Sequence, residues 1–100
     1  MTMPDPPAIP PGLESLLPQF VAEMEKDLAL LQALAGGGAE ALAEHVHAMR
    51  GKCAMFGEER LFALLTAFES RLVTAGGGEN AEFLGAIVAR VRQLGLYVEN

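Results

Sequence analysis

Two runs of three consecutive glycines, at residues 36–38 and 76–78, divide this chain of 100 residues into helix-forming segments. Glycine readily adopts the left-handed conformation that ends a helix, so three in a row supply a cap and then a turn. Short turns between helices make sequential helices pack antiparallel. Because no strand pattern competes, we expect an all-α protein that folds as an antiparallel up-and-down four-helix bundle.

The first segment combines helical spacing with an interruption by proline. Apolar residues recur at helical spacing over residues 13–34. Pro18 lies either in the first turn of a helix that begins near Ser15 or Leu16, or at a kink in a longer helix. Residues 1–12 hold all but one of the six prolines, which predicts a flexible lead-in, with the bundle formed by residues 13–100.

Three further helices are predicted, over residues 39–55, 58–75 and from 79 or 80 to about 98. Gly57 permits a tight turn between the second and the third of them. The inward face of the second helix is predicted to consist of Leu42, Val46, Met49, Cys53 and Phe56. The inward face of the third is predicted to consist of Leu61, Leu64, Leu65, Phe68 and Leu72.

Composition limits the classes of function. A hydrophobic content of 51% over 100 residues suffices for one modest core, which excludes a large multidomain enzyme. A formal net charge of −6 with seven Lys and Arg residues argues against nucleic-acid binding. The chain has no long uncharged apolar run, and its proline-rich start does not read as a signal peptide, so we expect a soluble, cytoplasmic monomer.

No cofactor or metal is expected. The sequence contains neither a glycine-rich phosphate loop with its lysine nor a metal-ligand spacing, so the protein is not expected to be the kinase that consumes ATP. The single cysteine, Cys53, is interpreted as a packing residue in a reducing compartment.

The residues around His47 form the candidate functional cluster. Arg50 and Gly51 follow His47 by three and four positions, so all three share one face of a helix. A cation there would stabilise a phosphoryl group on the imidazole. Glycine removes the side chain that would obstruct another protein, at a helix penalty of up to about 1 kcal/mol.

Glu69 is the predicted partner of the His47 imidazole. Gly57 comes ten residues after His47 and twelve before Glu69. Two antiparallel helices that leave a common turn bring residues at similar distances from that turn level with each other. A carboxylate that accepts a hydrogen bond from Nδ1 leaves the lone pair of Nε2 free as a nucleophile.

The order His47, any residue, aliphatic, Arg50, Gly51, five residues, Gly57 resembles the signature of histidine-containing phosphotransfer (HPt) domains. The similarity continues at the positions where such domains carry apolar residues and then Glu or Gln, which are here Leu61, Leu64, Phe68 and Glu69. It extends over residues 42–72. Lys52 and Met55 depart from the pattern, since small or polar residues are commoner at those two positions.

This resemblance implies a phosphorelay intermediate. His47 would accept a phosphoryl group from a histidine kinase or a receiver aspartate and pass it to a receiver aspartate, with Glu69 orienting the ring, Arg50 stabilising the phosphoryl group and Gly51 giving access. Glu at position 69 is typical of the corresponding domain in chemotaxis-type kinases. Lys52, Met55 and Arg60 are the candidate contacts to the acidic pocket or apolar surface of a receiver domain.

Other interpretations compete with this one. Cations near His47 are also compatible with an ordinary solvated helix face. Glu44 and His47 resemble half of a di-iron carboxylate motif, which this chain cannot complete because it has only two histidines and Leu42 stands where the other motif needs Glu. His45 is interpreted as incidental. The remaining alternative is a binding module that docks a receiver or kinase without being phosphorylated.

Overall fold

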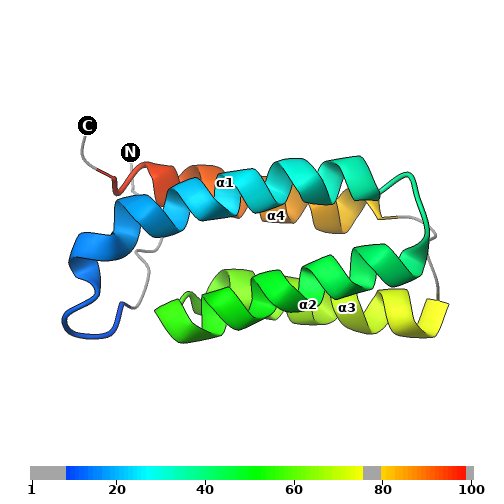
Figure 1. The fold of residues 1–100 in the computed structure, drawn as a ribbon, viewed down its shortest axis with the longest axis horizontal. Helices are drawn as coiled ribbons and strands as arrows, with labels where there is room; N and C mark the ends of the chain where they lie inside the picture. The colour runs from blue at the N-terminus through cyan, green and yellow to red at the C-terminus, as the bar shows by residue number, and fades with distance from the viewer. Residues whose placement is uncertain (1–8, 76–79, 99–100) are drawn as a thin grey trace.

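A computed structural model of the protein describes residues 9–75 and 80–98. A short 3-10 helix, η1 (Glu14–Leu16), leads into four α-helices: α1 (Leu17–Leu34), α2 (Ala39–Phe56), α3 (Glu59–Ala75) and α4 (Ala81–Gly95). Each helix packs against two neighbours, in the order α1, α2, α3, α4 and back to α1. The helices run alternately in opposite directions, with α1 beside α4 and α2 beside α3 (Figure 1). The predicted four-helix bundle is confirmed.

The helix boundaries follow local chemistry closely. Pro18 is the second residue of α1, where a backbone N–H would have no partner within the helix. Of the two predictions for Pro18, the one that placed it in the first turn of a helix is therefore correct. The fourth helix ends at Gly95, three residues earlier than expected. Residues 1–8 and 76–78, which carry most of the predicted lead-in and the second glycine run, lie outside the described residues. Ile9 packs against the core.

The core is formed by the faces that the sequence predicted for the middle helices. All five inward residues predicted for α2 are buried, as are Leu61, Leu65, Phe68 and Leu72 of α3, whereas Leu64 is half-buried. The thiol of Cys53 is fully buried, and burial raises its pKa to about 12. No helix within the described ranges is both long and apolar enough to cross a membrane.

Gly57 makes the turn that places α3 alongside α2. Its backbone is left-handed, with φ of 82°, a conformation in which an L side chain is strained. The N–H groups of Gly57 and Glu58 both donate to the Cys53 carbonyl, at 2.9 and 3.0 Å, and so satisfy the end of α2. The chain therefore reverses within two residues.

A buried ion pair ties this turn to α4. Glu58 Oε1 lies 2.7 Å from Arg90 Nη2, and both side chains are almost completely excluded from solvent. Glu58 Oε2 accepts hydrogen bonds from Arg90 Nε and from the Leu61 N–H in the first turn of α3. One carboxylate thus caps α3 and fixes α4 against the turn.

We predict that Arg90→Ala lowers the free energy of unfolding by about 3–5 kcal/mol, because it leaves the Glu58 carboxylate buried without its counter-charge. Chemical denaturation followed by circular dichroism measures the change. The double variant Glu58→Gln with Arg90→Met should recover most of this loss, since the amide oxygen still accepts from Leu61 and no charge is buried. Equal losses in the two variants would contradict this account.

Candidate functional site

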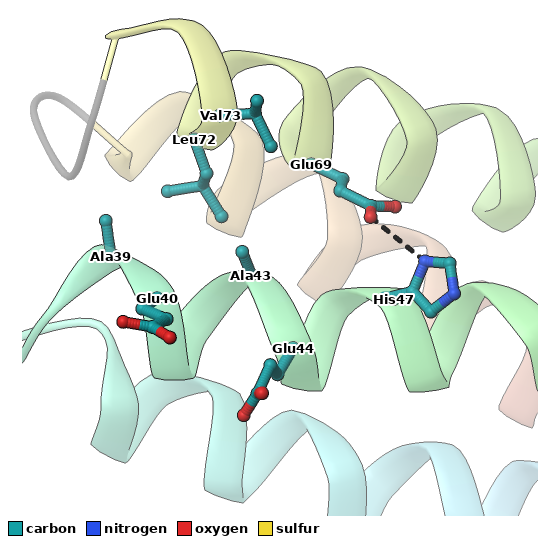
Figure 2. Close-up of a pocket in the computed structure, with 8 residues that line it drawn as sticks. All are labelled: Ala39, Glu40, Ala43, Glu44, His47, Glu69, Leu72 and Val73. Carbon is teal, nitrogen blue, oxygen red and sulfur yellow. Dashed lines mark hydrogen bonds and ion pairs between the residues drawn. The ribbon is translucent and has the colours of Figure 1, made fainter.

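His47 projects from the middle of α2 into solvent. The preceding residue, Val46, is fully buried, and a helix turns 100° per residue, so the His47 side chain leaves the core and is 64% exposed. Its ring stands at one end of the group of residues drawn in Figure 2, with one nitrogen directed towards α3 and the other turned away. The backbone at this point is regular helix, which gives the side chain a fixed origin.

The predicted contact between His47 and Glu69 is present. Nδ1 of His47 lies 2.9 Å from Oε2 of Glu69 on α3 (Figure 2). An ionised carboxylate can only accept, so in this contact Nδ1 carries the proton and donates it. The neutral ring then has its lone pair on Nε2, for which the described residues provide no hydrogen bond. The exposed nitrogen is the nucleophilic one.

Arg50 approaches the same carboxylate from the other side. Its Nη1 lies 3.1 Å from Glu69 Oε1. Oε1 is buried and accepts no hydrogen bond of good geometry, so the contact is a close charge pair without an aligned N–H···O bond. The guanidinium carbon lies 5.6 Å from the centre of the Phe62 ring on α3. Arg50 is therefore held by one carboxylate and one aromatic face.

Gly51 leaves open space beside the imidazole. It is exposed, and a Cβ built on it would meet no heavy atom within 4 Å outside the neighbouring backbone of α2. The helix continues through it without interruption as far as Phe56. Packing in the fold therefore does not require glycine at this position.

A shallow open groove of about 480 Å³ runs from His47 and Glu69 towards the start of α2. Its remaining lining residues are Ala39, Glu40, Ala43, Glu44, Leu72 and Val73. Glu40 and Glu44 are exposed, so the surface on this side of the imidazole is acidic, whereas Arg50 makes the other side basic. Within the described residues, no three His, Cys, Asp or Glu side chains are placed to share a metal ion.

The three predicted docking residues occupy different surfaces. Met55 is 81% exposed and lies two helical turns beyond His47, on the same side of α2 as Gly51. Lys52 faces α1, where its Nζ lies 2.9 Å from Asp27 Oδ2; this hydrogen bond raises the pKa of Lys52 above its usual value. Arg60 lines a groove between α3 and α4. Only Met55 continues the face that carries the imidazole.

His45 has a structural contact that the sequence did not reveal. Its Nε2 lies 2.8 Å from the backbone oxygen of Asp27, so the ring donates a hydrogen bond across to α1. The two histidines of α2 thus face different neighbours: His45 fastens α2 to α1, and His47 meets α3. Phe62 was also missed, although it stands two helical turns before Glu69 and hence on the same face of α3.

Comparison with known proteins identifies the family. The family model described as Hpt domain matches residues 15–95. No curated protein and no solved structure matches the chain significantly.

We predict that Glu69→Ala removes the preference of His47 for the tautomer protonated at Nδ1, because no acceptor remains within reach of that nitrogen. Glu69→Gln should keep much of the preference, since its amide oxygen can still accept. Imidazole 15N chemical shifts measure the tautomer directly. The free energy of unfolding should change by less than about 1 kcal/mol in both variants, because the pair is at the surface. A tautomer ratio unaffected by Glu69→Ala would show that the two side chains do not interact in solution.

Proposed function

Since the chain belongs to the Hpt domain family, which acts in phosphotransfer in two-component phosphorelays, we propose that His47 is its phosphoryl acceptor. The observation that carries this proposal is the exposed imidazole whose Nδ1 is held by Glu69, 2.9 Å away. His47 takes the phosphoryl group from a histidine kinase or from the aspartyl phosphate of a receiver, and passes it to a receiver aspartate. The protein has no ATP site of its own in this scheme and serves as a carrier.

The proposed transfer needs a lone pair at Nε2 and a fixed proton at Nδ1. The Nε2 lone pair attacks phosphorus, the bond from phosphorus to the aspartate oxygen breaks, and its electron pair stays on the released carboxylate. Nδ1 keeps its proton, so the phosphorylated ring is cationic. Glu69 then faces a positive ring, and this charge-assisted hydrogen bond is stronger than the one to neutral imidazole. Transfer to a receiver aspartate is the same step reversed.

Arg50 supplies positive charge next to the phosphoryl group. Arg50 is one helical turn from His47 and contacts the Glu69 carboxylate that also binds the imidazole. Its guanidinium therefore lies beside the His47 ring. Arginine suits this role because its planar fork matches the oxygens of a phosphoryl group and never loses its charge. No residue of this chain is assigned to activate the donor; in this scheme the partner contributes the acidic pocket and its Mg2+.

The proposed partner surface is centred on His47, Gly51 and Met55. Gly51 leaves room for a receiver to close over the imidazole, and Met55 offers an exposed apolar side chain on the same side of α2. Lys52 and Arg60 contact only the margins of that surface, because they face α1 and α4 respectively. We place the transfer in the cytoplasm, where receivers and kinase domains act.

Mutation of the two histidines tests the acceptor. His47→Gln should fold normally and accept no phosphoryl group from a receiver charged with acetyl phosphate, because the position is exposed and adds little to the core. His45→Gln is the matched control, and it should accept at the parental rate since its amide can still donate to Asp27. Acid-labile, base-stable label on intact protein is the readout. Label lost from the His45 variant and kept by the His47 variant would refute the assignment.

The same experiment separates the carrier from a pure docking module. A module that only blocks or scaffolds a receiver would bind it and acquire no label, in the parent protein as well as in both variants. Binding measured by titration calorimetry, together with labelling, therefore decides between the two functions.

Gly51→Gln tests access to the imidazole. The new side chain would extend into the open space beside His47, so transfer from a receiver should fall at least tenfold. Stability should stay level or rise by up to about 1 kcal/mol, because glutamine is the better helix former. The transfer rate should therefore fall while the melting temperature does not. Transfer at the parental rate would show that no partner approaches over Gly51.

A further inference from the structure

We propose that Phe62 is a positioning residue for phosphoryl transfer, which acts by holding the Arg50 guanidinium between Glu69 and the phosphoryl group on His47. This inference rests on the proposed function and extends it to a residue on α3. The guanidinium carbon of Arg50 lies 5.6 Å from the centre of the Phe62 ring, within the range of a cation–π contact. Phe62, on α3, therefore contacts the charged end of an arginine whose backbone belongs to α2.

The contact between Arg50 and Glu69 is suited to being exchanged. Before phosphorylation, Arg50 neutralises the Glu69 carboxylate, which also binds His47. Arg50 Nη1 lies 3.1 Å from Glu69 Oε1 without an aligned hydrogen bond. Little directional bonding is lost when the guanidinium turns away. Arg50 is also partly exposed, so its charged end has room to move.

Phosphorylation reverses the balance of charge around Glu69. The ring becomes cationic and pairs with Glu69, and the phosphoryl oxygens on Nε2 add negative charge on the solvent side. Arg50 then gains more from the phosphoryl group than from a carboxylate already paired with the ring. Because Arg50 follows His47 by one helical turn, this exchange needs a change of side-chain rotamer and no movement of the helix.

Phe62 stays in contact with the Arg50 guanidinium while the guanidinium exchanges one anion for the other. An aromatic face attracts the cation without specifying a direction in the plane of the ring, unlike a carboxylate, which binds at defined oxygen positions. A long arginine side chain in water has many rotamers, and fixing it on a partner costs conformational entropy. The ring limits that freedom before the donor arrives, so more of the attraction between Arg50 and the phosphoryl group is available to the transfer.

The test uses a small phosphoryl donor, phosphoramidate, which needs no docking surface. The rate of phosphorylation is followed by intact mass, and the small rate of His47→Gln is subtracted. Phe62→Leu should lower the rate constant about 2- to 5-fold, which corresponds to the 0.5–1 kcal/mol of a partly exposed cation–π contact. Phe62→Tyr keeps the aromatic face and should restore the rate. Phe83→Leu is the matched control, because Phe83 stacks on Phe68 and not on Arg50; it should leave the rate unchanged.

A double-mutant cycle distinguishes positioning from general loosening of the fold. In an Arg50→Ala background, Phe62→Leu should have no further effect on the rate, because the residue through which the ring acts is absent. An equal fall in both backgrounds, or an unchanged rate in the parental background, would overturn this inference and leave the acceptor assignment intact. If the parent protein acquires no label that depends on His47, the proposed function is overturned, and this inference with it.

Discussion

The packing of α2 against α3 across the Gly57 turn is the constraint on which the site depends. A slip of one residue between the helices would move a side chain by about 1.5 Å along the axis and 100° around it. A contact of 2.9 Å between His47 and Glu69 does not survive such a slip. The left-handed glycine fixes where α2 ends, and the buried Glu58 fixes where α3 begins. The register is therefore set by the turn and held by the core beneath it.

Glu69 is the electrostatic centre of this surface because its one carboxylate contacts both the His47 imidazole and the Arg50 guanidinium. One oxygen orients a neutral imidazole and the other lies against a guanidinium. Each partner meets a separate oxygen of the carboxylate, so the guanidinium and the imidazole do not compete for one acceptor atom. This arrangement leaves the lone pair of His47 Nε2 free and keeps the positive charge of Arg50 one helical turn from the imidazole. The Phe62 ring is a second contact of the same guanidinium, with its centre 5.6 Å from the guanidinium carbon.

Much of this arrangement could be predicted from the sequence, because it depends on periodicity and on local backbone chemistry. Helical spacing identified the faces of α2 and α3, and the similar distances from Gly57, ten and twelve residues, gave the pairing of His47 with Glu69. What could not be predicted are contacts made by the ends of long, flexible side chains. Lys52 with Asp27 and Arg50 with Phe62 each depend on the rotamer of a long side chain across a helix interface. Glu58 is the opposite case, since a carboxylate in a turn is normally exposed and is buried here only because Arg90 arrives from α4.

The fold does not account for the glycine at position 51. Glycine within a helix costs up to about 1 kcal/mol relative to alanine, and a Cβ at position 51 would meet no atom within 4 Å outside the neighbouring backbone of α2. Packing therefore offers no reason for the cost. Its neighbours on the inner face, Met49 and Cys53, are fully buried in the core. The helix continues through Gly51 as far as Phe56, and in the proposed transfer the absent side chain leaves the imidazole open to a partner.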